Sequence, residues 1–90
     1  MKKRILNYRI IVTPDVQTGT NKPGYTAYCP VLGLADDGDT IEEAISNLNG
    51  AIQIYIDSLV EDGLPVPMDN PDHDMVTTTQ IEAPPTLQPA

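Results

Sequence analysis

The 90-residue sequence contains no phenylalanine and no tryptophan, so aliphatic side chains and four tyrosines must form its core. Its single cysteine, Cys29, excludes an internal disulfide and a thiolate metal cluster, and it fits a reducing compartment. No apolar run approaches the roughly 20 residues that a membrane-spanning helix needs. Residues 1–4 resemble the basic start of a signal peptide, but Asn7 and Arg9 interrupt the apolar stretch that should follow. These features predict a cytoplasmic protein.

Positive charge is also scarce, since five Lys and Arg face 13 Asp and Glu and the formal net charge is −8. Proteins that bind nucleic acid neutralise phosphates with cations, whereas the basic cluster here is confined to residues 2–4. Direct binding of nucleic acid is therefore not expected. An acidic surface suits a basic protein partner, or it keeps the domain in solution. A chain of this length buries only about 60% of its unfolded surface, which favours self-association.

Three stretches have the composition of β-strands. The first, residues 5–13, is rich in β-branched side chains and stops at Pro14. Residues 14–24 contain two prolines and two glycines, which is a turn composition. Residues 25–29 form the second strand, closed by Pro30, and residues 31–35 form a short third strand. Strand alternation places four side chains of the first strand on one face; they are Leu6, Tyr8, Ile10 and Val12.

The strongest pattern is that of a helix over residues 40–62, which follows a turn at residues 36–39. Thr40 and Glu43 have the spacing of a capping box at its start. Gly63, followed by Pro65 and Pro67, ends it. Seven apolar residues lie within about 60° of one direction around the helix axis; they are Ile41, Ala44, Ile45, Leu48, Ile52, Tyr55 and Leu59.

After the helix, residues 64–74 read as a proline-rich acidic linker, and residues 75–82 have strand propensity from Val, Ile and Thr. The predicted order is β-β-β-α-β, an α+β fold in which one long helix packs on one face of a small antiparallel sheet. A single helix leaves the other face uncovered, and Ile5 and Ile11 are expected on that face. This favours a homo-oligomer.

Two helix residues depart from the apolar stripe. Gly50 lies about 180° and Ile54 about 140° from it, on the nominally exposed side. Glycine costs roughly 1 kcal/mol in a helix interior relative to alanine, and beside a projecting isoleucine it makes a notch that a partner could enter. The alternative is a tolerated surface glycine and one exposed isoleucine. With Ile5 and Ile11, these residues are the candidate partner or oligomer interface.

Groups that could carry chemistry are few. The acidic residues 36–39 lack the ligand spacing of a calcium loop, and the acids that follow them are favoured by the helix dipole, so we interpret them as a turn and a cap. The only histidine, His73, has an acidic residue on each side, but adjacent loop residues do not converge on a substrate. Cys29 is interpreted as a packing residue, with a pairing to His73 as the weaker alternative. We expect no catalytic residue, no metal and no cofactor.

Residues 24–32, GYTAYCPVL, followed by GDTIEEA at residues 38–44, resemble the HicB-like antitoxin family. In that family a Tyr-x-Ala strand leads to proline and leucine, and a Gly-acid-Thr turn starts a long helix. The resemblance covers residues 5–67 and includes Gly63-x-Pro65-x-Pro67. The chain departs from the family in the loop at residues 30–34, which lacks an acid and a second proline. Residues 68–90 also lack the C-terminal DNA-binding domain of full-length members, so autoregulation is not expected.

The resemblance implies a partial RNase H-like fold without nuclease activity. The length of the chain predicts a single domain, over residues 1–83, and the proline-rich residues 84–90 are expected to form a flexible tail. The resemblance further implies a small basic HicA-like toxin, an mRNA interferase, as the partner, and dimers or tetramers. The expected function is that of a non-enzymatic antitoxin. One alternative is an orphan oligomeric HicB-like module with no toxin, which binds another protein or a small ligand. The other is a metal-dependent nuclease that uses Asp36, Asp37, Asp39 or Glu43.

Overall fold

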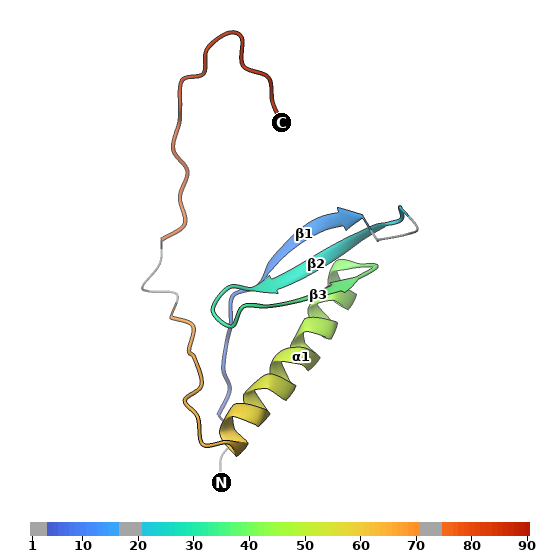
Figure 1. Cartoon of the computed structure of the whole chain (residues 1–90), viewed down its shortest axis with the longest axis vertical. Helices are drawn as coiled ribbons and strands as arrows, with labels where there is room; N and C mark the ends of the chain where they lie inside the picture. The colour runs from blue at the N-terminus through green and yellow to red at the C-terminus, as the bar shows by residue number, and fades with distance from the viewer. Residues whose placement is uncertain (1–3, 17–20, 71–74) are drawn as a thin grey trace.

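The computed structural model describes residues 4–16, 21–70 and 75–90. Within them three strands, β1 (Ile11–Val16), β2 (Pro23–Cys29) and β3 (Leu34–Gly38), form an antiparallel sheet in the order β1-β2-β3 (Figure 1). Helix α1 (Ile41–Glu61) packs on one face of this sheet. The predicted α+β class, with three strands followed by one long helix, is confirmed.

Strand pairing decides which side chains face the helix. Ala27 in β2 lies opposite Val12 in β1, and both pack in the core between the sheet and α1. Successive side chains of a strand point to opposite faces. Tyr28, the next residue, therefore points away from α1, on the same side as its pairing partner Ile11. We call this side of the sheet the open face.

The buried core is small and lies at the middle of β2. Four hydrophobic side chains among the described residues are fully buried, Ala27 and Cys29 from β2 and Ala44 and Leu48 from α1. Cys29 is thus a packing residue, as the sequence indicates. A ring of partly buried side chains packs around these four residues; it consists of Tyr8, Ile10, Val12, Tyr25, Leu32, Leu34 and Ile52.

The sheet and the helix approach each other most closely at the end of β3. A Cβ atom built on Gly38 would overlap the backbone of Ala44, in the first turn of α1. Ala44 is itself fully buried. Small residues on both sides therefore allow β3 and α1 to touch, and they fix where the helix begins.

Local signals set both ends of α1. At the start, Thr40 is the N-cap and its Oγ1 accepts a hydrogen bond from the Glu43 backbone N–H at 3.1 Å. At the end, Gly63 has a φ of 69°, in the left-handed region that glycine tolerates. The N–H of Leu64 then donates to the carbonyl oxygen of Leu59 at 2.9 Å, which satisfies one of the last carbonyls. The predicted helix is confirmed within one residue at each end.

The predicted strand boundaries are wrong in two places. The first strand was expected over residues 5–13, but β1 begins at Ile11 and continues through Pro14 to Val16. Pro14 is accommodated because β1 is an edge strand, where half of the backbone N–H groups need no partner. The third strand is later than expected, since Gly33 closes a turn by donating its N–H to the Cys29 carbonyl oxygen at 2.8 Å, and β3 follows from Leu34.

The predicted fourth strand over residues 75–82 is not formed. Residues 75–90, which we call the tail, run away from the sheet and the helix as exposed chain (Figure 1). Strand propensity alone does not make a strand, because the backbone needs a neighbouring edge to which it can hydrogen-bond. The tail has no such neighbour among the described residues.

Candidate functional site

The open face of the sheet carries two carboxylates around one hydroxyl. Thr26 Oγ1, from β2, lies 2.8 Å from Asp37 Oδ1 of β3 and 3.2 Å from Asp15 Oδ2 of β1. We call these three residues the acidic triplet. A threonine hydroxyl has only one proton to donate. Asp15 Oδ1 also accepts a hydrogen bond from the Val16 backbone N–H at 2.7 Å. Both carboxylates are exposed, so their oxygens can accept further hydrogen bonds from a partner.

Strand pairing explains why the triplet comes together. Thr26 lies directly opposite Asp37 in the β2–β3 pair and opposite Thr13 in the β1–β2 pair. Asp15 is two residues beyond Thr13, so its side chain emerges on the same face. Its own pairing partner is Gly24, which has no side chain to cover the carboxylate. The three strands thus place both acids on one exposed surface.

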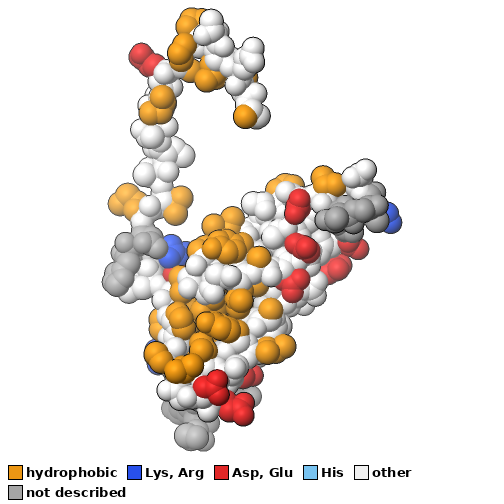
Figure 2. All heavy atoms as spheres, in the orientation of Figure 1, with side chains coloured by type: hydrophobic (Ala, Val, Ile, Leu, Met, Phe, Trp, Pro, Cys, Tyr) orange, Lys and Arg blue, Asp and Glu red, His pale blue; other side chains and the backbone are white. Residues whose placement is uncertain are grey.

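The acidic triplet is electrostatically uncompensated within the described part of the chain. The ion pair found there joins Arg9 to Asp69, and it involves neither carboxylate of the triplet. The two carboxylates lie on the outer strands β1 and β3 but converge on the same Thr26 hydroxyl of β2, so they repel each other and a cation from outside would relieve this repulsion. Figure 2 shows further acidic side chains gathered toward the end of the body where β3 leads into α1. This end of the molecule is suited to bind a basic surface.

The same acids do not converge as a metal site would require. Asp36 and Asp37 are adjacent in β3, so they point to opposite faces of the sheet. Among residues 4–16, 21–70 and 75–90, no group of three His, Cys, Asp or Glu side chains is placed to hold a metal ion. His73 lies outside the described residues. Part of the predicted acidic turn is in fact strand, because Asp36 and Asp37 pair with Ala27 and Thr26.

A second surface is apolar and lies along α1 from Ile45 to Val60. An open groove of about 990 Å³ separates the helix from residues 4–10 and from the segment after the helix. We call it the apolar groove. Its aliphatic lining comes from three segments; these side chains are Ile5, Leu6, Ile10, Ile45, Ile52, Ile56, Val60, Val66 and Met68. Arg4 and Asp57 also line it and supply charge at its rim.

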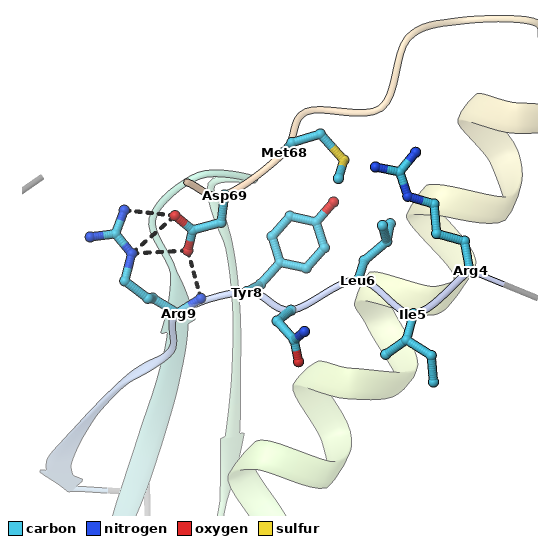
Figure 3. A pocket seen from close by; sticks show the side chains of 8 residues that line it. Arg4, Ile5, Leu6, Tyr8, Arg9, Met68 and Asp69 are labelled. Atoms are coloured by element: carbon cyan, nitrogen blue, oxygen red, sulfur yellow. Dashed lines mark hydrogen bonds and ion pairs between the residues drawn. The ribbon is translucent and has the colours of Figure 1, made fainter. Parts of the chain in front are cut away.

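An ion pair holds together the two segments that flank the groove (Figure 3). Arg9 NH2 lies 2.7 Å from Asp69 Oδ1, Arg9 Nε lies 3.0 Å from both carboxylate oxygens, and the Arg9 backbone N–H donates to Oδ2 at 2.7 Å. Tyr8 adds a bond from its hydroxyl to the carbonyl oxygen of Pro67 at 2.6 Å. We call these contacts the Arg9–Asp69 clip. They tie residues 8–9 to residues 67–69, which are about 60 positions further along the chain.

The clip perturbs two titrating groups. The hydrogen bonds from the Arg9 side chain and backbone lower the pKa of Asp69 below its ordinary value of 3.8. Burial raises the pKa of the Tyr8 hydroxyl, and the nearby Cys29 and Asp69 side chains raise it further. Asp69 is therefore charged, and Tyr8 neutral, near pH 7. Both groups are in the protonation states that their hydrogen bonds require.

The structure places the four predicted interface residues on three surfaces, because Gly50 and Ile54 lie one turn apart on the same side of α1. Ile5 is 82% exposed and lines the apolar groove, whereas Ile11 is 52% exposed and lies on the open face. Ile54 is 73% exposed on α1, outside the groove, and a Cβ on Gly50 would meet nothing within 4 Å. The four side chains therefore do not form one contact surface. Whether any of them contacts a partner stays a prediction.

Sequence reasoning missed both the acidic triplet and the clip. The triplet could have been found from strand alternation, had Asp15 and Asp37 been assigned to strands and not to turns. The clip had no such signal, because Asp69 belongs to a segment without regular structure and its partner is remote in sequence. Only the tertiary fold brings them together.

Comparison with known proteins gives one informative relative. The chain is 41% identical over 69 residues to a UPF0150 protein of Synechocystis sp., a match that covers 76% of this chain and 81% of the relative. No protein-family model matches the chain. No solved structure matches it either. Within the described residues, α1 is too polar to cross a membrane as a helix.

Proposed function

The chain belongs to the UPF0150 family, and we propose that it acts as a HicB-like antitoxin. In this function it has no enzymatic activity of its own, and it binds and neutralises a small basic ribonuclease of the HicA-like, mRNA-cleaving class. The structural observation that carries the proposal is the acidic triplet, with two exposed carboxylates that no described cation neutralises. The sequence resemblance over residues 5–67 supports it independently.

The chemistry of such a toxin explains why the triplet suits it. A protein that cleaves RNA holds phosphates with Lys and Arg side chains. The same cations pair strongly with carboxylates, and Arg does so with two parallel hydrogen bonds. Asp15 and Asp37 would therefore compete with RNA for the basic surface of the toxin. The net charge of −8 would also accelerate the encounter at low salt.

The proposal includes three further statements. The fold is a partial RNase H-like one that serves as a scaffold and not as a nuclease. The protein forms dimers or tetramers, which cover apolar surface that the monomer leaves exposed. It works in the cytoplasm, where the mRNA substrate of the toxin is found.

The proposal expects a small basic protein to be encoded beside this chain, and its test is neutralisation of that protein. Expressed alone, that protein should arrest growth and cleave mRNA, and co-expression of this chain should restore growth. In the purified pair, the double variant Asp15→Asn/Asp37→Asn should weaken binding by about tenfold or more, because charge pairs across an interface are coupled. Isothermal titration at two salt concentrations measures this change.

A matched control removes the same charge elsewhere. The variant Glu61→Gln/Asp62→Asn also deletes two negative charges, but at the far end of α1, where both residues are exposed. It should change the dissociation constant by less than about threefold, as expected of remote surface charges. Equal losses in both variants would mean that net charge alone drives binding and that the triplet is not the contact.

Failure to restore growth would instead favour the alternative function. In that case the chain would be an orphan oligomeric HicB-like module that binds another protein or a small ligand. Its signature would be a homo-oligomer that purifies without any basic partner. A metal-dependent nuclease activity, abolished by Asp36→Asn, would contradict both functions.

A further inference from the structure

The chain exposes far more surface than a compact protein of its size. Its accessible surface is 7838 Å² at a mass of 9.8 kDa, whereas a compact monomer of that mass exposes about 5,200 Å². Its radius of gyration is 17.6 Å, against about 12 Å expected for 90 residues. The excess of about 2,600 Å² is of the size that each subunit of an obligate oligomer buries. The monomer is therefore incomplete as a packed unit.

Much of this excess belongs to the tail, residues 75–90. Its apolar side chains are almost fully solvated, with Met75 87%, Val76 92%, Ile81 82% and Leu87 60% exposed. Figure 2 shows hydrophobic side chains along a segment of chain that stands apart from the body. While these four large aliphatic side chains are in water, the chain forgoes the favourable free energy that their burial would supply. The tail has no surface of its own that could cover them.

The apolar groove has the length and chemistry to accept this tail. In an extended chain Met75 and Ile81 point in the same direction, about 20 Å apart at 3.3 Å per residue. On α1 the apolar lining of the groove runs from Ile45 to Val60, which is about 22 Å at 1.5 Å per residue. The two rows match in length. Pro84 and Pro85 follow the matching segment and cannot continue a strand pairing.

Charge favours the same pairing between two copies of the chain. With a net charge of −8, two bodies repel each other. The tail is the exception, because Glu82 is its only charged side chain among the 13 acidic residues of the chain. In the extended tail Glu82 lies on the opposite side from Met75 and Ile81, so its charge stays outside the apolar groove. The tail is thus the part of one copy that another copy repels least.

We propose that the protein is a tail-exchanged dimer, in which residues 75–82 of each copy fill the apolar groove of the other, with Met75 and Ile81 pointing into it. The arrangement is reciprocal, as a two-fold symmetric interface requires. The occupant is a second copy and not the chain's own tail, which runs away from the sheet and from α1 (Figure 1). This proposal is independent of toxin binding, and its test uses no toxin.

The first test measures the mass of the full-length protein and of two tail variants by light scattering and sedimentation. The unmodified chain should be a dimer. Met75→Ser/Ile81→Ser should raise the dimer dissociation constant at least about 100-fold, since two buried aliphatic side chains are lost. Neither residue contacts the body of its own copy, so folding is unaffected. Val76→Ser/Thr78→Ser alters the opposite side of the strand and should change the constant less than about threefold.

The second test identifies the contact through introduced cysteines. The only natural cysteine, Cys29, is fully buried and does not compete. Ile81→Cys in one copy should form a mixed disulfide with Gln53→Cys, at the groove, in a copy of different mass. Ser46→Cys, an exposed helix residue outside the groove, is the control and should react at least about tenfold more slowly because the two thiols are not held together.

Three results would overturn the proposal. The first is that the unmodified chain is monomeric at micromolar concentration. A dimer whose dissociation constant responds equally to both tail variants, or to neither, would overturn the proposal in the same way. The second is equal cross-linking to Gln53→Cys and Ser46→Cys. The third is an internal disulfide in a monomer that carries both Ile81→Cys and Gln53→Cys, because the tail would then cover its own groove.

Discussion

The two halves of α1 have the same apolar spacing but very different surroundings. In the first half, Ala44 and Leu48 are fully buried against β2. In the second half, the stripe residues Ile52, Tyr55 and Leu59 are only partly buried. Val60, which lies off the stripe beside the apolar groove, is 63% exposed. A periodic apolar stripe therefore predicts a helix equally well in both halves, but it does not predict which part of that helix is core.

The difference follows from the lengths of the elements. With 21 residues, α1 is about 31 Å long at 1.5 Å per residue. With five residues, β3 spans only about 17 Å at 3.4 Å per residue. The C-terminal half of α1 must therefore extend beyond the sheet, where residues 4–10 and the clip flank it. The sheet makes the first half a core element, and the second half is left as a surface for contacts.

Leu48→Ala, in the first half of α1, should cause the largest loss in the free energy of unfolding. Leu48 is fully buried at the centre of the core, so its truncation removes apolar burial and leaves a cavity. The expected loss is about 3 kcal/mol in the free energy of unfolding. Out of a typical total of about 5–15 kcal/mol, this is a large fraction. Denaturation by urea, followed by circular dichroism, measures it.

The matched variant in the second half is Val60→Ala. Because Val60 is mostly exposed, the same measurement on the isolated, monomeric protein should show a change of no more than about 0.5 kcal/mol. A loss at Val60 comparable to that at Leu48 would mean that the second half is core as well. The distinction between the two halves would then be wrong.

Alanine substitutions at two glycines should change the free energy of unfolding by smaller amounts and with opposite signs. Gly38→Ala brings a Cβ into the backbone of Ala44 and forces β3 away from α1, so it should cost about 2 kcal/mol through overpacking. Gly50→Ala adds a methyl group where nothing lies within 4 Å, and should stabilise the helix by up to about 1 kcal/mol. Thermal unfolding of both variants checks the two signs, and a loss at Gly50 would contradict an open surface there.

An element of the fold could be predicted from the sequence when residues close to its ends determine those ends, and not when distant pairing partners determine them. The helix could be predicted because its cap at Thr40 and its terminating Gly63 act within a few residues of each end. The strand boundaries depend on pairing partners that the sequence does not specify. Pro14 looks like a strand end but lies within β1, because an edge strand tolerates it. Asp36 and Asp37 look like a turn but lie in β3, opposite Ala27 and Thr26.

The candidate site was less predictable for the same reason. The triplet combines residues of three strands, so an error of a few positions in strand assignment conceals it. The fourth strand was predicted from propensity alone, and residues 75–82 are exposed chain because no sheet edge of the same copy pairs with them. Strand propensity without a pairing edge indicates only that the segment can form a strand when such an edge is supplied.

The smallest predicted effect concerns the clip that flanks the second half of α1. Hydrogen bonds from Arg9 lower the pKa of Asp69 in the folded protein below 3.8, so the unfolded chain binds its proton at higher pH. Stability from this group is therefore present above its unfolded pKa and is lost as the pH falls through the lower folded pKa. Asp69→Asn should remove this part of the acid dependence. Urea unfolding between pH 5 and pH 2 should show a shallower slope for the variant than for the unmodified chain.

Asp57→Asn is the control for the clip, because it removes an exposed carboxylate from the same half of α1. Asp57 accepts a hydrogen bond from Gln53 Nε2 at 2.9 Å and forms no ion pair within the described residues. Its variant should keep the acid slope of the unmodified chain. If the slopes of both variants coincided with that of the unmodified chain, Arg9 would not hold Asp69 in solution. Residues 4–10 would then lack the ion pair that ties them to residues 67–69, and only the Tyr8–Pro67 hydrogen bond and apolar contacts would remain there among the described residues.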